Sequence, residues 1–116
     1  MIFNLEPCLR DKRGRNVADY TTREHYEKLS EELLEAHEAA VAVEFDDRGT
    51  TDVTDEIWEL LHVMTVCAAR IKAIADEFHI SDEQLAQMQK DVIKHNRKRG
   101  YLKIPAVKAK GTANAH

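Results

Sequence analysis

The chain has few residues that interrupt or cross-link a polypeptide: 4 glycines, 2 prolines and 2 cysteines among 116 residues. Cys8 and Cys67 lack a Cys-x-x-Cys spacing, which argues against a disulfide framework or a thiolate zinc site. No apolar run approaches the roughly 18 residues that span a bilayer, and the N-terminus lacks the pattern of a signal peptide. We therefore expect a cytoplasmic protein that does not interact with membranes.

Charge is distributed unevenly along the chain, although the net charge is only −4. Residues 20–91 carry 18 acidic and 6 basic side chains, whereas residues 92–116 carry 7 basic side chains and no acidic one. An acidic body argues against specific binding of nucleic acid and suits a protein that concentrates cations.

Hydrophobic periodicity predicts helices and no strand. The first helix begins at a capping box formed by Thr21 and Glu24 and extends to about residue 43 or 44. Its predicted core stripe recurs at helical spacing and comprises Leu29, Leu33, Ala36, Ala40 and Val43. The last helix begins at a second capping box, Ser81 to Gln84, and ends near residue 97 or 98. Gly100 follows it as a natural left-handed C′ residue.

The middle helix, over about residues 53–78 with Thr51 or Asp52 as its cap, is the most apolar part of the chain. Its apolar side chains cover roughly 220° of the helical wheel, so it needs neighbours on more than one side. We predict an all-α fold with three main helices per chain, whose four-helix-bundle core is completed by oligomerisation. The predicted divisions are an N-terminal arm over 1–19, a helical domain over 20–101 and a flexible basic tail over 102–116.

Two Glu-x-x-Glu pairs place four carboxylates on two of these helices: Glu32, Glu35, Glu56 and Glu59. Side chains at i and i+3 are neighbours on a helix surface, and carboxylate oxygens are ligands that Mg²⁺ prefers. The first pair has a simpler explanation as part of a solvated acidic face. The second lies inside the apolar arc, where Glu is rare without a partner. Arg70 of the same predicted helix could also neutralise Glu59 if neighbouring helices bring the two together.

Three short motifs resemble the MazG-like all-α nucleotide pyrophosphohydrolases, which include phosphoribosyl-ATP pyrophosphohydrolase and the dimeric dUTPases. The motifs lie between about residues 24 and 101. They are Glu31-Glu32-Leu33-Leu34-Glu35, the segment Asp55-Glu56-Ile57-Trp58-Glu59-Leu60-Leu61, and Lys94-His95-Asn96-Arg97-Lys98-Arg99-Gly100-Tyr101. One position departs from the family pattern: its second pair normally ends in Asp, and Glu59 stands there.

The resemblance implies a hydrolase that cleaves a (d)NTP or related nucleotide to the monophosphate and pyrophosphate, with Mg²⁺ as cofactor and Mn²⁺ as a substitute. It implies that Glu32, Glu35, Glu56 and Glu59 bind the metal and form the catalytic site. The substrate-binding residues that it implies are Lys94, Asn96, Arg99 and Tyr101. It also implies a homodimer or a dimer of dimers.

Two other functions stay open on the sequence alone. A catalytically silent helical module that dimerises and binds a protein partner would explain the wide apolar face and the Glu at position 59. A ferritin-like di-metal protein would use Glu59-Leu60-Leu61-His62 as its Glu-x-x-His motif, but that architecture needs a second such motif on another helix.

Overall fold

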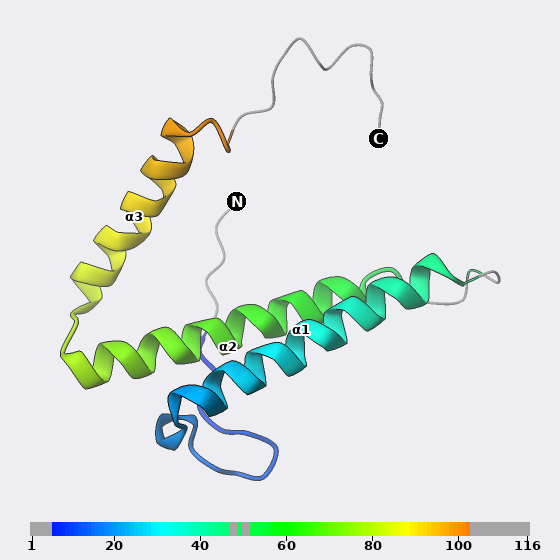
Figure 1. Cartoon of the computed structure of the whole chain (residues 1–116), viewed down its shortest axis with the longest axis horizontal. Coiled ribbons are helices and arrows are strands. Elements are labelled where there is room, and N and C mark those ends of the chain that lie inside the picture. The colour runs from blue at the N-terminus through cyan, green and yellow to red at the C-terminus, as the bar shows by residue number, and fades with distance from the viewer. Residues whose placement is uncertain (1–5, 47–48, 50–51, 103–116) are drawn as a thin grey trace. The chain divides into compact units, whose positions relative to one another are not determined.

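Figure 1 shows the computed structural model, which describes residues 6–46, 49 and 52–102. The elements are a short 3₁₀ helix, η1 (Val17–Asp19), and the helices α1 (Thr22–Glu44), α2 (Asp55–Phe78) and α3 (Asp82–Lys98). The described residues contain no strand, only an isolated antiparallel bridge between Arg10 and Asn16. The prediction of an all-α chain with three main helices is confirmed.

Local hydrogen bonds set the predicted helix ends. The Thr21 hydroxyl accepts from the backbone N–H of Glu24 at 3.1 Å, and the Glu24 carboxylate accepts from the backbone N–H of Thr21 at 2.9 Å. Ser81 and Gln84 form the same reciprocal pair at 3.1 and 2.8 Å. Both capping boxes are therefore present. Gly100 has a φ of 77°, the left-handed conformation predicted for the residue that ends α3.

Helix α2 begins two residues later than predicted. The Asp52 carboxylate accepts hydrogen bonds from the backbone N–H and the hydroxyl of Thr54, at 2.8 and 2.7 Å. An Asp side chain that bonds two residues ahead stabilises a turn, so Val53 and Thr54 form a turn and the helix starts at Asp55. Thr51, the other predicted cap, lies outside the described residues.

Helices α1 and α2 pack side by side as an antiparallel hairpin (Figure 1). Arg70, late in α2, donates to the hydroxyl of Thr22 at the start of α1 at 3.4 Å, whereas Glu59, early in α2, lies close to Glu35 in the middle of α1. Among the residues that the structure describes, the buried apolar side chains are few and mostly small: Val17, Ala36, Val66, Ala69 and Ala75. Small side chains at a helix contact allow the two axes to approach closely.

The chain divides into two compact units, Met1–Phe78 and His79–His116. The first contains the hairpin and the loop that precedes it. The second contains α3, in which no residue is buried. Within α3, Leu85 and Asn96 are half-buried, whereas Met88 and Val92 are exposed. Helix α3 therefore has little core of its own within one chain.

The wide apolar arc predicted for α2 is only partly covered within one chain. Ile57 is 58% exposed and Leu60 is 43% exposed, and these two are i, i+3 neighbours on one face. In the predicted core stripe of α1, Leu33 is 48% exposed. Adjacent large apolar side chains in water are characteristic of a surface that contacts another molecule.

Parts of the predicted N-terminal arm are ordered. From Glu6 onward the arm consists of a closed loop followed by η1, whose Val17 is buried against α2. The predicted tail over 102–116 lies outside the described residues apart from Leu102. No described helix combines the length and the apolar character that crossing a membrane requires.

Candidate metal centre

Three of the four predicted carboxylates meet between α1 and α2. Glu32, Glu35 and Glu59 each offer one oxygen, and these oxygens all lie within 4.8 Å of one another. Glu32 and Glu35 share a face of α1 because they are three residues apart. The antiparallel packing of α2 then brings Glu59 to that face. Convergence of both Glu-x-x-Glu motifs depends on this pairing of helices, which spacing alone does not determine.

The charges of this cluster are only partly compensated. Glu32 is buried, at 8% exposure, and its carboxylate pairs with the Lys28 ammonium at 3.1 Å. The charge of Glu32 raises the pKa of Glu35, with further contributions from burial and from the charge and a hydrogen bond of Glu59. Lys12 works in the opposite direction by lowering the pKa of Glu35. The net result is a carboxyl group that is harder to ionise than usual because its neighbours repel the charge.

The donor set suits a hard divalent cation. Opposite oxygens in an octahedral Mg²⁺ shell are separated by about 4.2 Å, twice the usual Mg–O distance of about 2.1 Å. Donors within 4.8 Å of one another therefore need only small side-chain movements to share one ion. A cation between them would also remove the repulsion that raises the pKa of Glu35. Carboxylate chemistry, spacing and electrostatics thus fit a magnesium or manganese ion.

Glu56 lies one turn before Glu59 on α2 and is half-buried, but it is not part of the group whose oxygens converge. The position of Glu56 and Glu59 inside the apolar arc predicted that they would be the more buried pair, and the structure differs. The most buried of the four carboxylates is Glu32, from the pair that had the simpler explanation as a solvated face. The role of Glu56 in metal binding stays a prediction.

The longer side chain at position 59 reaches the cluster. Glu59 stands where the MazG-like pattern has Asp, and its oxygen converges with those of Glu32 and Glu35. In the hairpin, Arg70 does not neutralise Glu59. Arg70 donates to Thr22 and forms no ion pair with any described residue.

A pocket of about 330 Å³ opens beside the cluster. Its wall combines acidic, basic and aromatic side chains, the most relevant being Glu32, Glu35, Glu59, Arg10, Lys12, Lys28, Trp58 and His62. The Trp58 and His62 rings contact each other, with centroids 5.3 Å apart and planes inclined by 56°. Trp58 is 63% exposed, so the hairpin does not bury it as a core residue. His62 lies at the pocket, although it is not one of the convergent donors.

Two of the basic residues of this wall, Arg10 and Lys12, come from a segment to which the sequence assigned no function. Residues 10–15, called the basic loop below, hold Arg10, Lys12, Arg13 and Arg15 around Asp11. The signal that could have identified them is the contrast between this basic run and the acidic helix that follows it. Opposite charges close in sequence were a reason to expect contact between the loop and α1.

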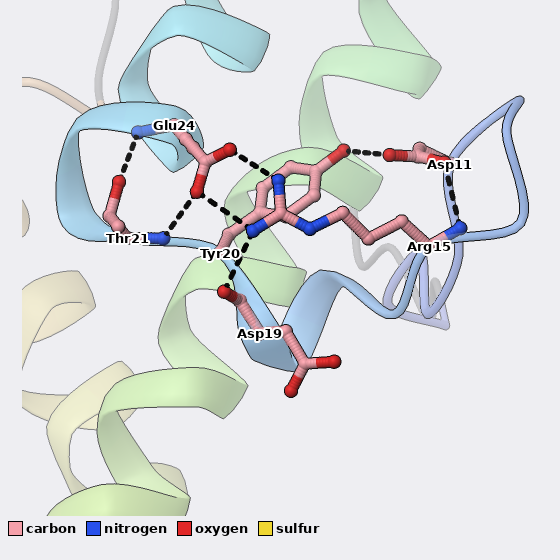
Figure 2. A network of polar contacts seen from close by, with 6 residues as sticks. All are labelled: Asp11, Arg15, Asp19, Tyr20, Thr21 and Glu24. Carbon is pink, nitrogen blue, oxygen red and sulfur yellow. Dashed lines mark hydrogen bonds and ion pairs between the residues drawn. The ribbon is translucent and has the colours of Figure 1, made fainter.

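Hydrogen bonds hold the basic loop in shape (Figure 2). The Asp11 carboxylate accepts from the backbone N–H groups of Arg13 and Arg15, at 2.9 and 3.0 Å, and from the Tyr20 hydroxyl at 2.7 Å. The Arg15 guanidinium forms a bidentate ion pair with the Glu24 carboxylate and donates to the backbone oxygen of Asp19 at 3.1 Å. The loop is therefore tied to η1 and to the start of α1.

The four predicted substrate-binding residues belong to the other unit, around the end of α3. The Arg99 guanidinium stacks over the Tyr101 ring at 4.5 Å and donates to the Tyr101 hydroxyl at 2.5 Å. Asn96 is half-buried, and its backbone carbonyl accepts from the N–H of Tyr101 at 2.9 Å. Lys94 is exposed. Arg99 and Tyr101 thus form a local cationic and aromatic group, and the substrate role of all four residues stays a prediction.

No family model matches the chain, and no curated protein and no solved structure is significantly similar to it.

Proposed function

We propose that this protein is a Mg²⁺-dependent nucleotide pyrophosphohydrolase that cleaves a (d)NTP or related nucleotide to the monophosphate and pyrophosphate. The observation that carries the proposal is the convergence of Glu32, Glu35 and Glu59 at a pocket that also has cationic and aromatic walls. Acidic donors suit the metal, cations suit phosphates and an exposed Trp suits a base. The same pocket thus offers groups for the metal, the phosphates and the base of a nucleotide.

The chain's own residues have distinct tasks in this proposal. Glu32, Glu35 and Glu59 hold the cation, with Glu56 as a fourth carboxylate one turn away. When bound, the metal neutralises charge on phosphate oxygens and helps to position the attacking water. Water adds across the anhydride bond between the α- and β-phosphates, so pyrophosphate is the leaving group. Lys28, paired with Glu32 at 3.1 Å, compensates part of the negative charge of the cluster.

The proposed active form is a homodimer or a dimer of dimers in the cytoplasm. Support comes from the apolar faces that one chain leaves in water, including Ile57 at 58% and Leu60 at 43% exposure. Packing two hairpins against each other would complete a four-helix bundle and cover these side chains. In this proposal Lys94, Asn96, Arg99 and Tyr101 bind the substrate, as the resemblance implies.

The second candidate is a silent helical module that dimerises and binds a protein partner. The exposed apolar faces of α1 and α2 support this module as much as they support the hydrolase. Such faces indicate that the chain assembles with another molecule, and they say nothing about a reaction. It gives no reason for three mutually repelling carboxylates to converge. The ferritin-like alternative has less support, because His62 is not among the convergent donors.

A nucleotide screen tests the proposal. All canonical and several modified (d)NTPs are incubated with the full chain and Mg²⁺ or Mn²⁺, and pyrophosphate and orthophosphate are measured separately. We expect pyrophosphate release from at least one nucleotide, abolished by EDTA. Orthophosphate as the primary product would indicate a different reaction. A protein that sediments as a dimer but releases neither product would support the silent module.

A further inference from the structure

We propose that the basic loop forms a phosphate-binding subsite, in which Arg10 and Lys12 hold the polyphosphate of the ligand opposite the carboxylate cluster. The ligand class is a metal-complexed di- or triphosphate. This inference rests on the proposed function and assigns the N-terminal loop a role that the resemblance of the helices does not supply.

The first support is position. Arg10, Lys12 and Lys28 line the same pocket of about 330 Å³ as Glu32, Glu35 and Glu59. A polyphosphate that shares oxygens with a metal has further oxygens without metal contacts. Cations on the facing wall of the pocket can neutralise those oxygens.

The second support is that two neighbouring cations, Arg15 of the basic loop and Lys28 of the pocket wall, already have partners. Arg15 is paired with Glu24, and Lys28 is paired with Glu32 and Glu31 at 3.1 and 3.7 Å. Arg10, Lys12 and Arg13 form no ion pair with any described residue. Since Arg10 and Lys12 also line the pocket, they are the cations left to meet an anion there.

The third support is the rigidity of the loop that carries them. Arg10 is bridged to Asn16 across the loop, and the backbone N–H of Cys8 donates to the carbonyl of Thr65 on α2 at 3.3 Å. Asp11 closes the loop from within by accepting from two backbone N–H groups. A loop fixed at both ends and in the middle loses little backbone conformational entropy when its side chains bind a ligand.

Arg13 offers a matched control within the same loop. It lines a different hollow of about 420 Å³ with Glu24, Glu27 and Glu31, and it is not part of the wall around the carboxylates. Arg10→Gln, Lys12→Gln and Arg13→Gln each remove one positive charge from residues 10–15, so the net charge changes equally.

The test is isothermal titration calorimetry of the full-length protein and these variants with sodium pyrophosphate in saturating MgCl₂, and with MgCl₂ alone. We expect Arg10→Gln and Lys12→Gln each to weaken pyrophosphate binding about tenfold, the usual effect of losing a charged hydrogen bond. Arg13→Gln should stay within about twofold of the parent. Binding of Mg²⁺ alone should be unchanged or tighter in Lys12→Gln, because a positive charge near Glu35 has been removed.

Opposite changes for the two ligands distinguish a subsite from a structural role. If Lys12→Gln loses Mg²⁺ and pyrophosphate binding together, the loop only supports the fold and the subsite is wrong. Equal pyrophosphate affinities for all three variants also overturn it, while the hydrolase proposal survives. A parent protein that binds neither Mg²⁺ nor pyrophosphate overturns the proposed function, and the subsite with it.

Discussion

Two glutamates of α1, Glu24 and Glu35, lie in opposite electrostatic environments. Glu24 accepts hydrogen bonds from the Arg15 guanidinium and then from the backbone of Thr21, and its pKa falls to about 2. Glu35, three turns later, faces Glu32 and Glu59, and its pKa rises. The first carboxylate is fully compensated by the chain itself. The second is left in a group with excess negative charge, although Lys28 and Lys12 are near.

This difference separates a structural group from a candidate functional one. Compensated charges such as Glu24 and Arg15 hold the basic loop on α1 and have no spare capacity for a ligand. In a cluster whose charge is only partly compensated, the carboxylates repel one another, and a bound cation would relieve that repulsion. Carboxylates with perturbed pKa values in a pocket are typical of functional sites. The comparison predicts opposite responses of the two clusters to mutation, to metal and to pH.

The largest effect should follow removal of a convergent donor. Glu59→Gln keeps the size of the side chain but removes its charge, and we expect Mg²⁺ affinity and pyrophosphate release to fall by about a hundredfold or more, beyond the cost typical of outer-shell changes. Because repulsion is relieved, thermal stability without metal should be unchanged or higher. Calorimetry with Mg²⁺ and thermal unfolding monitored by circular dichroism measure the two quantities.

Glu38→Gln is the matched control for that experiment, since Glu38 is an exposed residue of α1 outside the cluster. It should leave Mg²⁺ affinity within about twofold of the parent. A Glu59→Gln protein that binds Mg²⁺ like Glu38→Gln would show that the cluster is not a metal site.

Glu56→Gln should have the next largest effect. Glu56 lies a turn away from the convergent oxygens, so we expect a loss in Mg²⁺ affinity of about tenfold, as for a group that acts from the edge of a metal site. The measurement is the same titration. A loss equal to that of Glu59→Gln would mean that Glu56 is a direct ligand in the assembled protein, and no loss would limit the site to three carboxylates.

Arg15→Gln should affect stability and leave the metal site intact. The variant breaks the ion pair with Glu24 and the bond to the Asp19 carbonyl, so the basic loop loses its attachment to α1. We expect a lower midpoint of thermal unfolding, with Mg²⁺ affinity within about twofold of the parent. Arg13→Gln serves as control and should leave the midpoint unchanged. Loss of Mg²⁺ binding in Arg15→Gln alone would contradict the separation of the two clusters.

The smallest effects are differences in how stability responds to acid. The pKa of Glu24 is lowered, so its contribution is complete above its usual value of 4.5 and is lost as pH falls from 4.5 to about 2. The pKa of Glu35 is raised, so its ionisation destabilises the fold at neutral pH. That cost disappears as pH falls through the raised pKa toward 4.5.

Urea unfolding of Glu24→Gln, Glu35→Gln and the parent at several pH values measures these contributions as differences. We expect Glu24→Gln to be less stable than the parent at pH 7, with the difference shrinking below pH 4.5. Glu35→Gln should be more stable than the parent at pH 7, with the gain vanishing toward pH 4.5 and also on addition of Mg²⁺. If both variants change stability in the same direction at pH 7, the proposed difference between Glu24 and Glu35 is wrong.

Most of the secondary structure could be predicted because its signals are local. The capping boxes at Thr21 and Ser81 act within one turn of chain, and so does the left-handed Gly100. The start of α2 was misplaced because Asp52 bonds to Thr54 and holds a turn that hydrophobic periodicity does not reveal. The pairs Glu32-x-x-Glu35 and Glu56-x-x-Glu59 were visible as motifs for the same reason.

What sequence alone determined about this protein is therefore the set of helices, their caps and the carboxylates that share each helix face. The tertiary structure decided that Glu32 is the most buried carboxylate, that Glu59 and not Glu56 joins the first pair, and that the basic loop shares their pocket. The physical reason is the sequence separation of the residues in contact. Helices and caps form through contacts within four residues, whereas burial, repulsion and pocket walls arise only when α2 and the N-terminal loop pack on α1.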